Sequence, residues 1–127
     1  MGDCSACVQI LDQEGNALLP QVRRCETFLC RLRGLMFRRH LPPDEGLLFI
    51  ERVESRLGTA IHMLFVLFPI AIVWLSSDGT VVDALIARPF HPFYAPRSPA
   101  RYYLEGPPEL LGRVRVGDHL TLQGLHR

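Results

Sequence analysis

The chain has 127 residues and a formal net charge of +1, from 14 basic and 13 acidic side chains. Hydrophobic residues make up 48% of it and charged residues 21%, a balance that excludes intrinsic disorder and argues against a general nucleic-acid coat. Every basic residue is arginine, so mechanisms that need a Schiff-base or P-loop lysine are excluded. The length suits a single domain over residues 1–127, with residues 1–7 as a loose N-terminal end.

The N-terminal half predicts two short strands, a helix and a third strand. Residues 8–11 form the first strand, residues 12–16 a turn, and residues 17–22 the return strand. Apolar side chains at helical spacing predict an amphipathic helix over residues 26–33, which Gly34 ends in a left-handed conformation. Residues 47–50 form the next strand.

The stretch from Leu57 to Ser76 is long enough to cross a membrane, and His62 is its only ionisable residue. Its β-branched and aromatic residues favour strands, and Pro69 divides it into two strand-sized pieces. A turn at residues 76–79 then returns the chain into a strand over residues 80–85. We therefore interpret the stretch as buried strands rather than a transmembrane helix.

The remaining chain predicts a loop over residues 88–101, with four prolines and no acid, and a strand at 102–104. Residues 105–108 are interpreted as loop, residues 107–111 as one helical turn, and residues 119–122 as the last strand. Many short strands with one or two short helices indicate a mainly β or α+β fold, compact and barrel-like.

The order of several motifs resembles the DUF192 (UPF0127) family. The segments that carry the resemblance are RGLMFR (33–38), LPPDEGLLF (41–49), IHMLF (61–65), FPIAIVWL (68–75), DGTVV (78–82), YLE (103–105) and GD (117–118). The resemblance covers about residues 8–122 and implies a small, compact, mainly β domain with a short helix. It implies no reaction, cofactor or ligand. The chain departs from the family at Ala71 and Ser76, where relatives usually carry acids.

Four cysteines allow a zinc site as an alternative interpretation. Cys4 and Cys7 have ligand spacing, whereas Cys25 and Cys30 are five residues apart and would not share a helix face. We expect instead that Cys25 and Cys30 are small buried apolar residues and that the other two lie on the loose end. No metal and no cofactor are predicted, and the thiols are expected to be reduced in a cytoplasmic protein without a secretory signal.

Arginines are concentrated between residues 23 and 39, a segment that contains a single acid, Glu26. Arg24, Arg31 and Arg38 are seven residues apart and would form one stripe on a helix, able to take phosphate or an acidic surface. The alternative is a solvated face that pairs with acids elsewhere in the fold, which the balanced overall charge favours.

The loop over residues 88–99 interleaves rings, prolines and cations, which is typical of binding loops, although such rings also pin loops in place. His62 is interpreted as a hydrogen-bonded core histidine, with a pocket acid–base as the alternative. We expect a binding module without catalysis for a small molecule or peptide. Its candidate binding residues are Arg33, Arg38, His62, Phe90, Phe93 and Tyr94.

Two other functions stay open. One is an enzyme of unknown reaction that uses His62 with a nearby acid, and the other is an interaction protein that docks through the arginine stripe. Neither nucleic acid nor a membrane is an expected partner, and the sequence does not define the oligomeric state.

Overall fold

The computed structural model describes residues 7–26, 30 and 34–125. Within them the chain is mainly β, as predicted. Its strands are β1 (Cys7–Leu11), β2 (Gln21–Cys25), β3 (Glu45–Ser55), β4 (Ile70–Leu75), β5 (Val81–Ala87), β6 (Ala100–Gly106) and β7 (Thr121–Gln123). A short 3-10 helix, η1 (Pro108–Gly112), follows β6 where the sequence predicts a helical turn that begins with proline.

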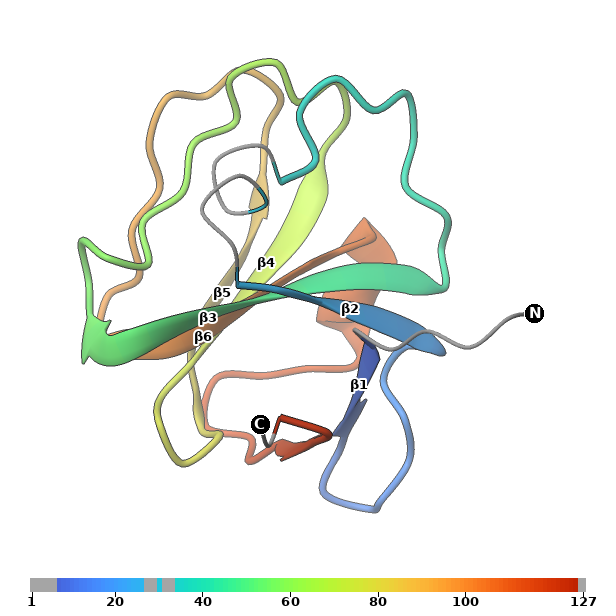
Figure 1. Ribbon diagram of the computed structural model, residues 1–127, viewed down its shortest axis with the longest axis vertical. Coiled ribbons are helices and arrows are strands. Elements are labelled where there is room, and N and C mark those ends of the chain that lie inside the picture. Colours follow the sequence, from blue (N-terminus) through green and yellow to red (C-terminus); the bar gives the residue numbers. More distant parts are fainter. Residues whose placement is uncertain (1–6, 27–29, 31–33, 126–127) are drawn as a thin grey trace.

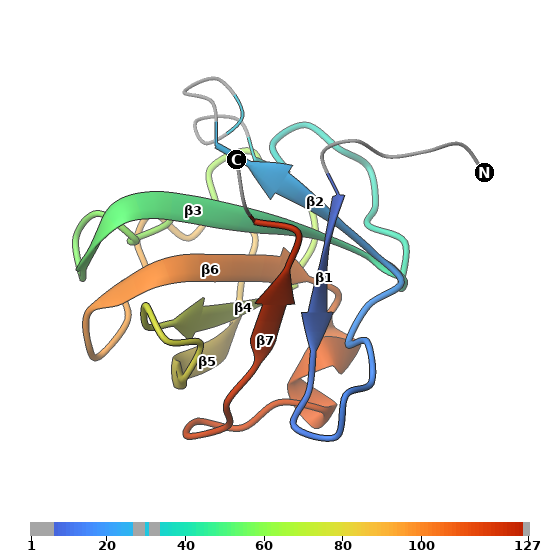
Figure 2. The ribbon, with the colours of Figure 1, turned by 60° about the horizontal axis from the view of Figure 1, so that its bottom comes forward.

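The seven strands form one curled sheet in the order β5-β4-β6-β3-β2-β1-β7. All neighbours are antiparallel except β2 and β3. The segment before β7 returns to the β4–β5 turn, where Thr80 and His119 form a bridge and Leu120 N–H donates to Gly79 O over 2.9 Å. Figures 1 and 2 show the resulting curl, which agrees with the predicted barrel-like shape.

Gly79 is required for this closure. Its φ is +91°, and a Cβ at this position would collide with the carbonyl oxygen of Leu120. The hairpin predicted at residues 76–79 is therefore confirmed. It also makes the contact that joins the segment before β7, at one end of the sheet, to the β4–β5 turn at the other end.

The first return strand begins later than predicted. Only an isolated bridge joins Leu11 to Ala17, and β2 starts at Gln21. Leu18 and Leu19 between them are buried in the core rather than paired along a strand. Apolar residues that fill a core from a loop give the same sequence signal as a strand, which explains the difference.

The apolar stretch before Pro69 is a loop, which corrects the prediction of two strands. Residues 61–69 are held by the loop over residues 88–99: Ile61 pairs with Tyr94, Met63 N–H donates to His91 O, and Phe90 N–H donates to Met63 O. The second piece is β4, whose six residues are all buried. None of the helical segments in the described part of the chain has the length and apolarity to span a bilayer.

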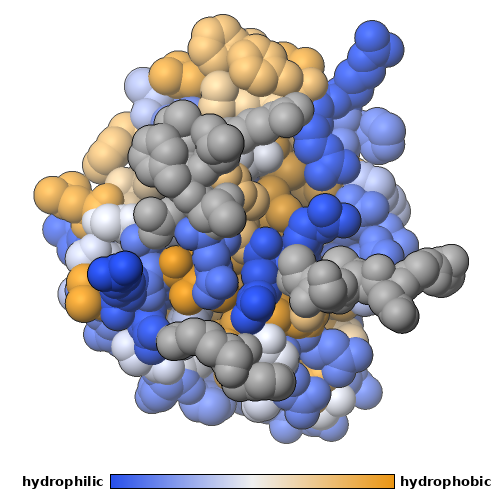
Figure 3. Space-filling model, in the orientation of Figure 1, coloured by the Kyte–Doolittle hydropathy of each residue, from blue (hydrophilic) through white to orange (hydrophobic). Residues whose placement is uncertain are grey.

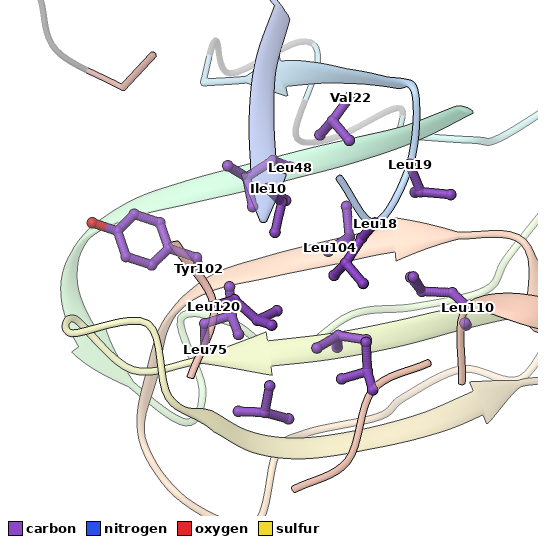
Figure 4. Packing of buried hydrophobic residues seen from close by; sticks show 14 of the residues in the cluster. Ile10, Leu18, Leu19, Val22, Leu48, Leu75, Tyr102, Leu104, Leu110 and Leu120 are labelled. Carbon is purple, nitrogen blue, oxygen red and sulfur yellow. The ribbon is translucent and has the colours of Figure 1, made fainter. Parts of the chain in front are cut away.

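Two hydrophobic clusters lie on the two faces of the sheet. Figure 4 shows the inner cluster, where Ile10, Val22, Leu48, Leu104 and Leu120 from separate strands and the closing segment pack together. The outer cluster contains Trp74, Phe49 and Tyr103, and loops cover it. Trp74 Nε1 donates to Thr59 O over 2.7 Å, which ties one covering loop to the sheet.

The helix predicted over residues 26–33 lies largely outside the described residues. At its expected end Gly34 has φ +50° and donates its N–H to Cys30 O over 2.7 Å, which confirms the predicted left-handed conformation. The predicted helical stripe of arginines is wrong, because Arg24 lies in β2 and Arg38 follows the turn over residues 34–37. Arg31 lies outside the described residues.

Candidate functional site

A pocket of about 50 Å³ opens on the outer face of the sheet, under the covering loops. The sheet contributes Phe49, Tyr103 and Glu105, and the loops contribute residues 34–36, 60–62 and Val66. A water needs at least about 10 to 15 Å³ of such space, so the pocket holds a few waters or one small organic group.

Strand register places the sheet residues of this pocket. Phe49 of β3 pairs with Tyr103 of β6, and their rings stack with centroids 4.5 Å apart. Side chains alternate along a strand, so Tyr103 and Glu105 point to the same face. The pocket wall is therefore a flat aromatic pair with a carboxyl beside it.

Glu105 is a buried acid in an apolar setting. Its cross-strand neighbours are Leu47 in β3 and Ile72 in β4, and only 7% of the residue is exposed. Among the described residues no hydrogen-bond donor or cation pairs with its carboxyl. Burial alone raises the pKa of Glu105 from 4.5 to about 8, so the carboxyl is largely protonated at neutral pH.

His62 brings a second titratable side chain to the same pocket. The backbone N–H of Leu64 donates to its Nδ1 over 3.2 Å. This bond needs an unprotonated Nδ1, which leaves the ring proton of the neutral imidazole on Nε2. The pocket thus combines an imidazole donor with a carboxylic acid.

The other predicted site residues that the structure describes do not line this pocket. Arg38 pairs with Glu45 over 3.5 Å, and the Tyr94 hydroxyl accepts a hydrogen bond from Arg88 N–H over 2.9 Å. Phe90 and Phe93 are exposed on their loop. Arg33 lies outside the described residues. Among the predicted residues that the structure describes, His62 alone lines the pocket.

The cysteines correct a further expectation. Cys25 and Cys30 form a disulfide, so neither is a reduced thiol and neither offers a thiolate to a metal. Cys4 lies outside the described residues. Across the described chain, no three side chains from His, Cys, Asp and Glu gather closely enough to hold one ion.

Sequence reasoning missed Glu105, which was interpreted as loop, as well as Phe49 and Tyr103. One signal was available: Glu105 follows Tyr103 by two residues, and strand alternation puts both on one face. An acid on the buried face of a strand suggests function, because an unpaired buried carboxyl costs stability. Ala71, interpreted from the sequence as a departure from the family, lies in the inner cluster and is not among the residues that line the pocket.

Comparison with known proteins gives a consistent family match. The DUF192 family model, described as "Uncharacterized ACR", matches residues 9–122. A UPF0127 protein of Pyrococcus furiosus is 36% identical over 109 residues, which cover 84% of this chain and 90% of that protein. A UPF0127 protein of Thermococcus kodakarensis is also 36% identical, over 86% of this chain and 68% of that protein.

Two crystal structures share the fold. One, from Sinorhizobium meliloti, is named as a candidate transcription regulator and has a TM-score of 0.79 at 28% identity, over 94% of both chains. The other, a protein of unknown function from Novosphingobium aromaticivorans, has a TM-score of 0.77 at 22% identity, over 91% of this chain and 83% of that chain.

Proposed function

The chain belongs to the DUF192 family of uncharacterised proteins, and from this premise we propose that its pocket binds an amino group, with the Glu105 carboxyl as the polar contact. The ligand is a small amine or the amino-bearing end of a larger molecule or peptide. One observation carries the proposal: Glu105 is only 7% exposed, it lines a pocket, and no described residue forms a hydrogen bond or ion pair with its carboxyl.

An unpaired carboxyl in an apolar setting favours a ligand that brings a hydrogen-bond donor with positive charge. A buried acid without a partner is costly, and an ammonium at hydrogen-bond distance offsets that cost through a charge-assisted bond. Arg38, two residues after the pocket residue Met36, is already paired with Glu45. The ligand therefore supplies the charge that the described pocket lacks.

The remaining walls suit an apolar body next to the amino group. Phe49 and Tyr103 offer stacked rings, and Leu35 and Val66 add aliphatic surface from the loops. The volume admits a few non-hydrogen atoms, so a larger ligand would leave its body outside the pocket.

The experiment compares amines with alcohols of the same shape. Propylamine and benzylamine are titrated into the protein by calorimetry, beside propanol and benzyl alcohol. We expect the amines to bind more tightly and to release a proton near pH 7, because an ammonium favours the ionised form of Glu105. Proton release makes the observed enthalpy depend on the ionisation enthalpy of the buffer.

Glu105→Gln keeps the shape of the side chain and removes the titrating proton. We expect this variant to lose both the preference for amines and the buffer dependence. Equal binding of amines and alcohols by the native protein, or unchanged amine binding by Glu105→Gln, would contradict the proposal.

General acid–base catalysis is a second candidate, which the presence of His62 and Glu105 in one pocket favours. An acid with a pKa of about 8 donates and accepts protons near neutral pH, as a general acid or base requires. If the pocket is catalytic, we expect turnover of a bound substrate at a rate that depends on pH, and we expect Glu105→Gln to abolish that pH dependence. A binding module retains affinity for its ligand without any turnover.

A further inference from the structure

Three phenylalanines from separate loops form an exposed cluster, here called the aromatic apex. It consists of Phe37, Phe65 and Phe90. The Phe37 and Phe65 rings stack with centroids 5.2 Å apart, and Phe65 meets Phe90 edge to face at 6.3 Å. Phe37 N–H also donates to Phe65 O over 2.8 Å. Figure 1 shows the loops meeting at the top of the molecule, and Figure 3 shows hydrophobic residues gathered there.

The backbone of the apex is strained. Phe37, Phe65 and Phe90 have φ values of +66°, +62° and +63°, and they are the only non-glycine residues of the described chain with positive φ. A bulky side chain rarely adopts this conformation, which favours glycine or asparagine. Strained residues of this kind concentrate at functional sites, where surrounding structure holds them in place.

Burial does not account for the strain. The three residues remain 61%, 49% and 52% exposed, and Leu64 and Leu67 beside Phe65 are also exposed. A strained backbone that presents aromatic rings to solvent lowers the stability of the isolated chain. Contiguous exposed apolar surface of this kind marks an interaction site with another molecule or a membrane.

The loops of the apex carry positive charge and no acid. Residues 34–43, 60–69 and 88–99 contain four arginines and neither Asp nor Glu. Arg38 pairs with Glu45, and Arg97 pairs with Asp83. Arg39 and Arg88, next to the apex phenylalanines in sequence, are exposed. The complementary partner is therefore apolar with negative charge at its edge.

We propose that the aromatic apex docks on the surface of an anionic lipid bilayer. Phenylalanine rings at protruding loop tips can enter the interfacial region, while nearby arginines stay at the level of anionic headgroups. A second copy of the chain fits poorly, because pairing two apices would bring like charges together. The apex is built from different side chains than the Glu105 contact, so this inference does not depend on the proposed ligand.

The experiment is sedimentation of the native protein with phospholipid vesicles. One set of vesicles contains phosphatidylcholine alone, and the other contains phosphatidylcholine and phosphatidylglycerol in equal parts. We expect binding to the anionic vesicles that weakens as salt increases, because salt screens the arginine contribution. Absence of binding to anionic vesicles, or equal binding to both sets, overturns the proposal.

Asparagine variants test the apex itself. Asparagine tolerates positive φ, so Phe65→Asn and the triple variant with Phe37→Asn and Phe90→Asn should unfold at an unchanged or higher urea concentration. We expect about tenfold weaker vesicle binding for Phe65→Asn and none detectable for the triple variant. Val116→Asn, at a position that is 52% exposed outside the apex loops, is the matched control and should bind as the native protein does.

Two results contradict the proposal at this step. One is vesicle binding that the folded Phe65→Asn variant retains in full. The other is that the native protein binds an acidic, leucine-rich peptide but does not bind vesicles. This result would mean that the apex contacts a protein partner instead.

Discussion

Gly34 lies against the carboxyl of Glu105: a Cβ added at Gly34 would be 3.7 Å from Oε1 of Glu105 and 3.5 Å from Cζ of Phe49. The approach is close because Gly34 follows the predicted helix with φ +50° and carries no side chain. A loop glycine thus leaves the buried acid open to a ligand, and the shape of the pocket depends on both residues.

Alanine at Gly34 should reduce both stability and binding. We expect the free energy of unfolding to fall by about 1 kcal/mol, because alanine is strained at positive φ. The added methyl group also narrows the pocket beside Glu105, so propylamine should bind more weakly. Urea denaturation and calorimetry measure the two effects.

Gly15→Ala is the matched control for this variant. Gly15 has φ +88°, and a Cβ there would meet no atom within 4 Å. It should show a similar loss of stability with unchanged amine binding. Equal loss of binding in both variants would show that Gly34 acts only through stability.

Stability should depend on pH through Glu105. Its pKa is about 8 in the folded chain against 4.5 as the ordinary value, so the folded state binds more protons between these pH values. The contribution of Glu105 to the free energy of unfolding is therefore greatest below pH 4.5, and it decreases as the pH rises to about 8. The slope is at most about 1.4 kcal/mol per pH unit.

Comparison with Glu105→Gln isolates this contribution, because glutamine does not titrate. Urea denaturation of both proteins between pH 5 and 8 gives the difference in unfolding free energy. We expect that difference to change steadily over this range, which lies between the ordinary pKa of 4.5 and the folded pKa of about 8. A constant difference would mean that Glu105 is ionised in the folded chain throughout.

The Cys25–Cys30 disulfide should stabilise the fold. It closes a short loop with a sequence separation of 5, and Cys25 is buried in the outer cluster. The chain-entropy model gives about 2 kcal/mol for a loop of this size. Cys25→Ala with Cys30→Ala should lower the free energy of unfolding by that amount without a reductant. Stability equal to that of the native protein would contradict this role.

Periodicity and turn chemistry predicted much of the sheet but not its covering loops. The turn over residues 76–79 and the strands around it follow from local signals, and so does the helical turn after Pro107. Residues 61–69 look like a strand because they are apolar, yet they bond to the loop over residues 88–99. That pairing joins distant parts of the chain, which local patterns do not encode.

The candidate site was harder to predict because it depends on register. His62 was singled out as an ionisable residue in an apolar stretch, and the structure places it in the pocket. Glu105 was hidden in a Pro- and Gly-rich context that resembles a loop. The apex strain at Phe37, Phe65 and Phe90 has no sequence signal, since the backbone conformation is set by contacts between loops. The sequence accordingly suggested no membrane partner.

The most direct test of the account is the pKa of the Glu105 carboxyl, measured by carbon NMR titration of the side chain with and without propylamine. We predict a value of about 8 in the free protein and a lower value when the amine is bound. A value near 4.5 in the free protein, or one that the amine does not change, would contradict the claim that Glu105, a buried acid without a partner among the described residues, binds a cationic ligand.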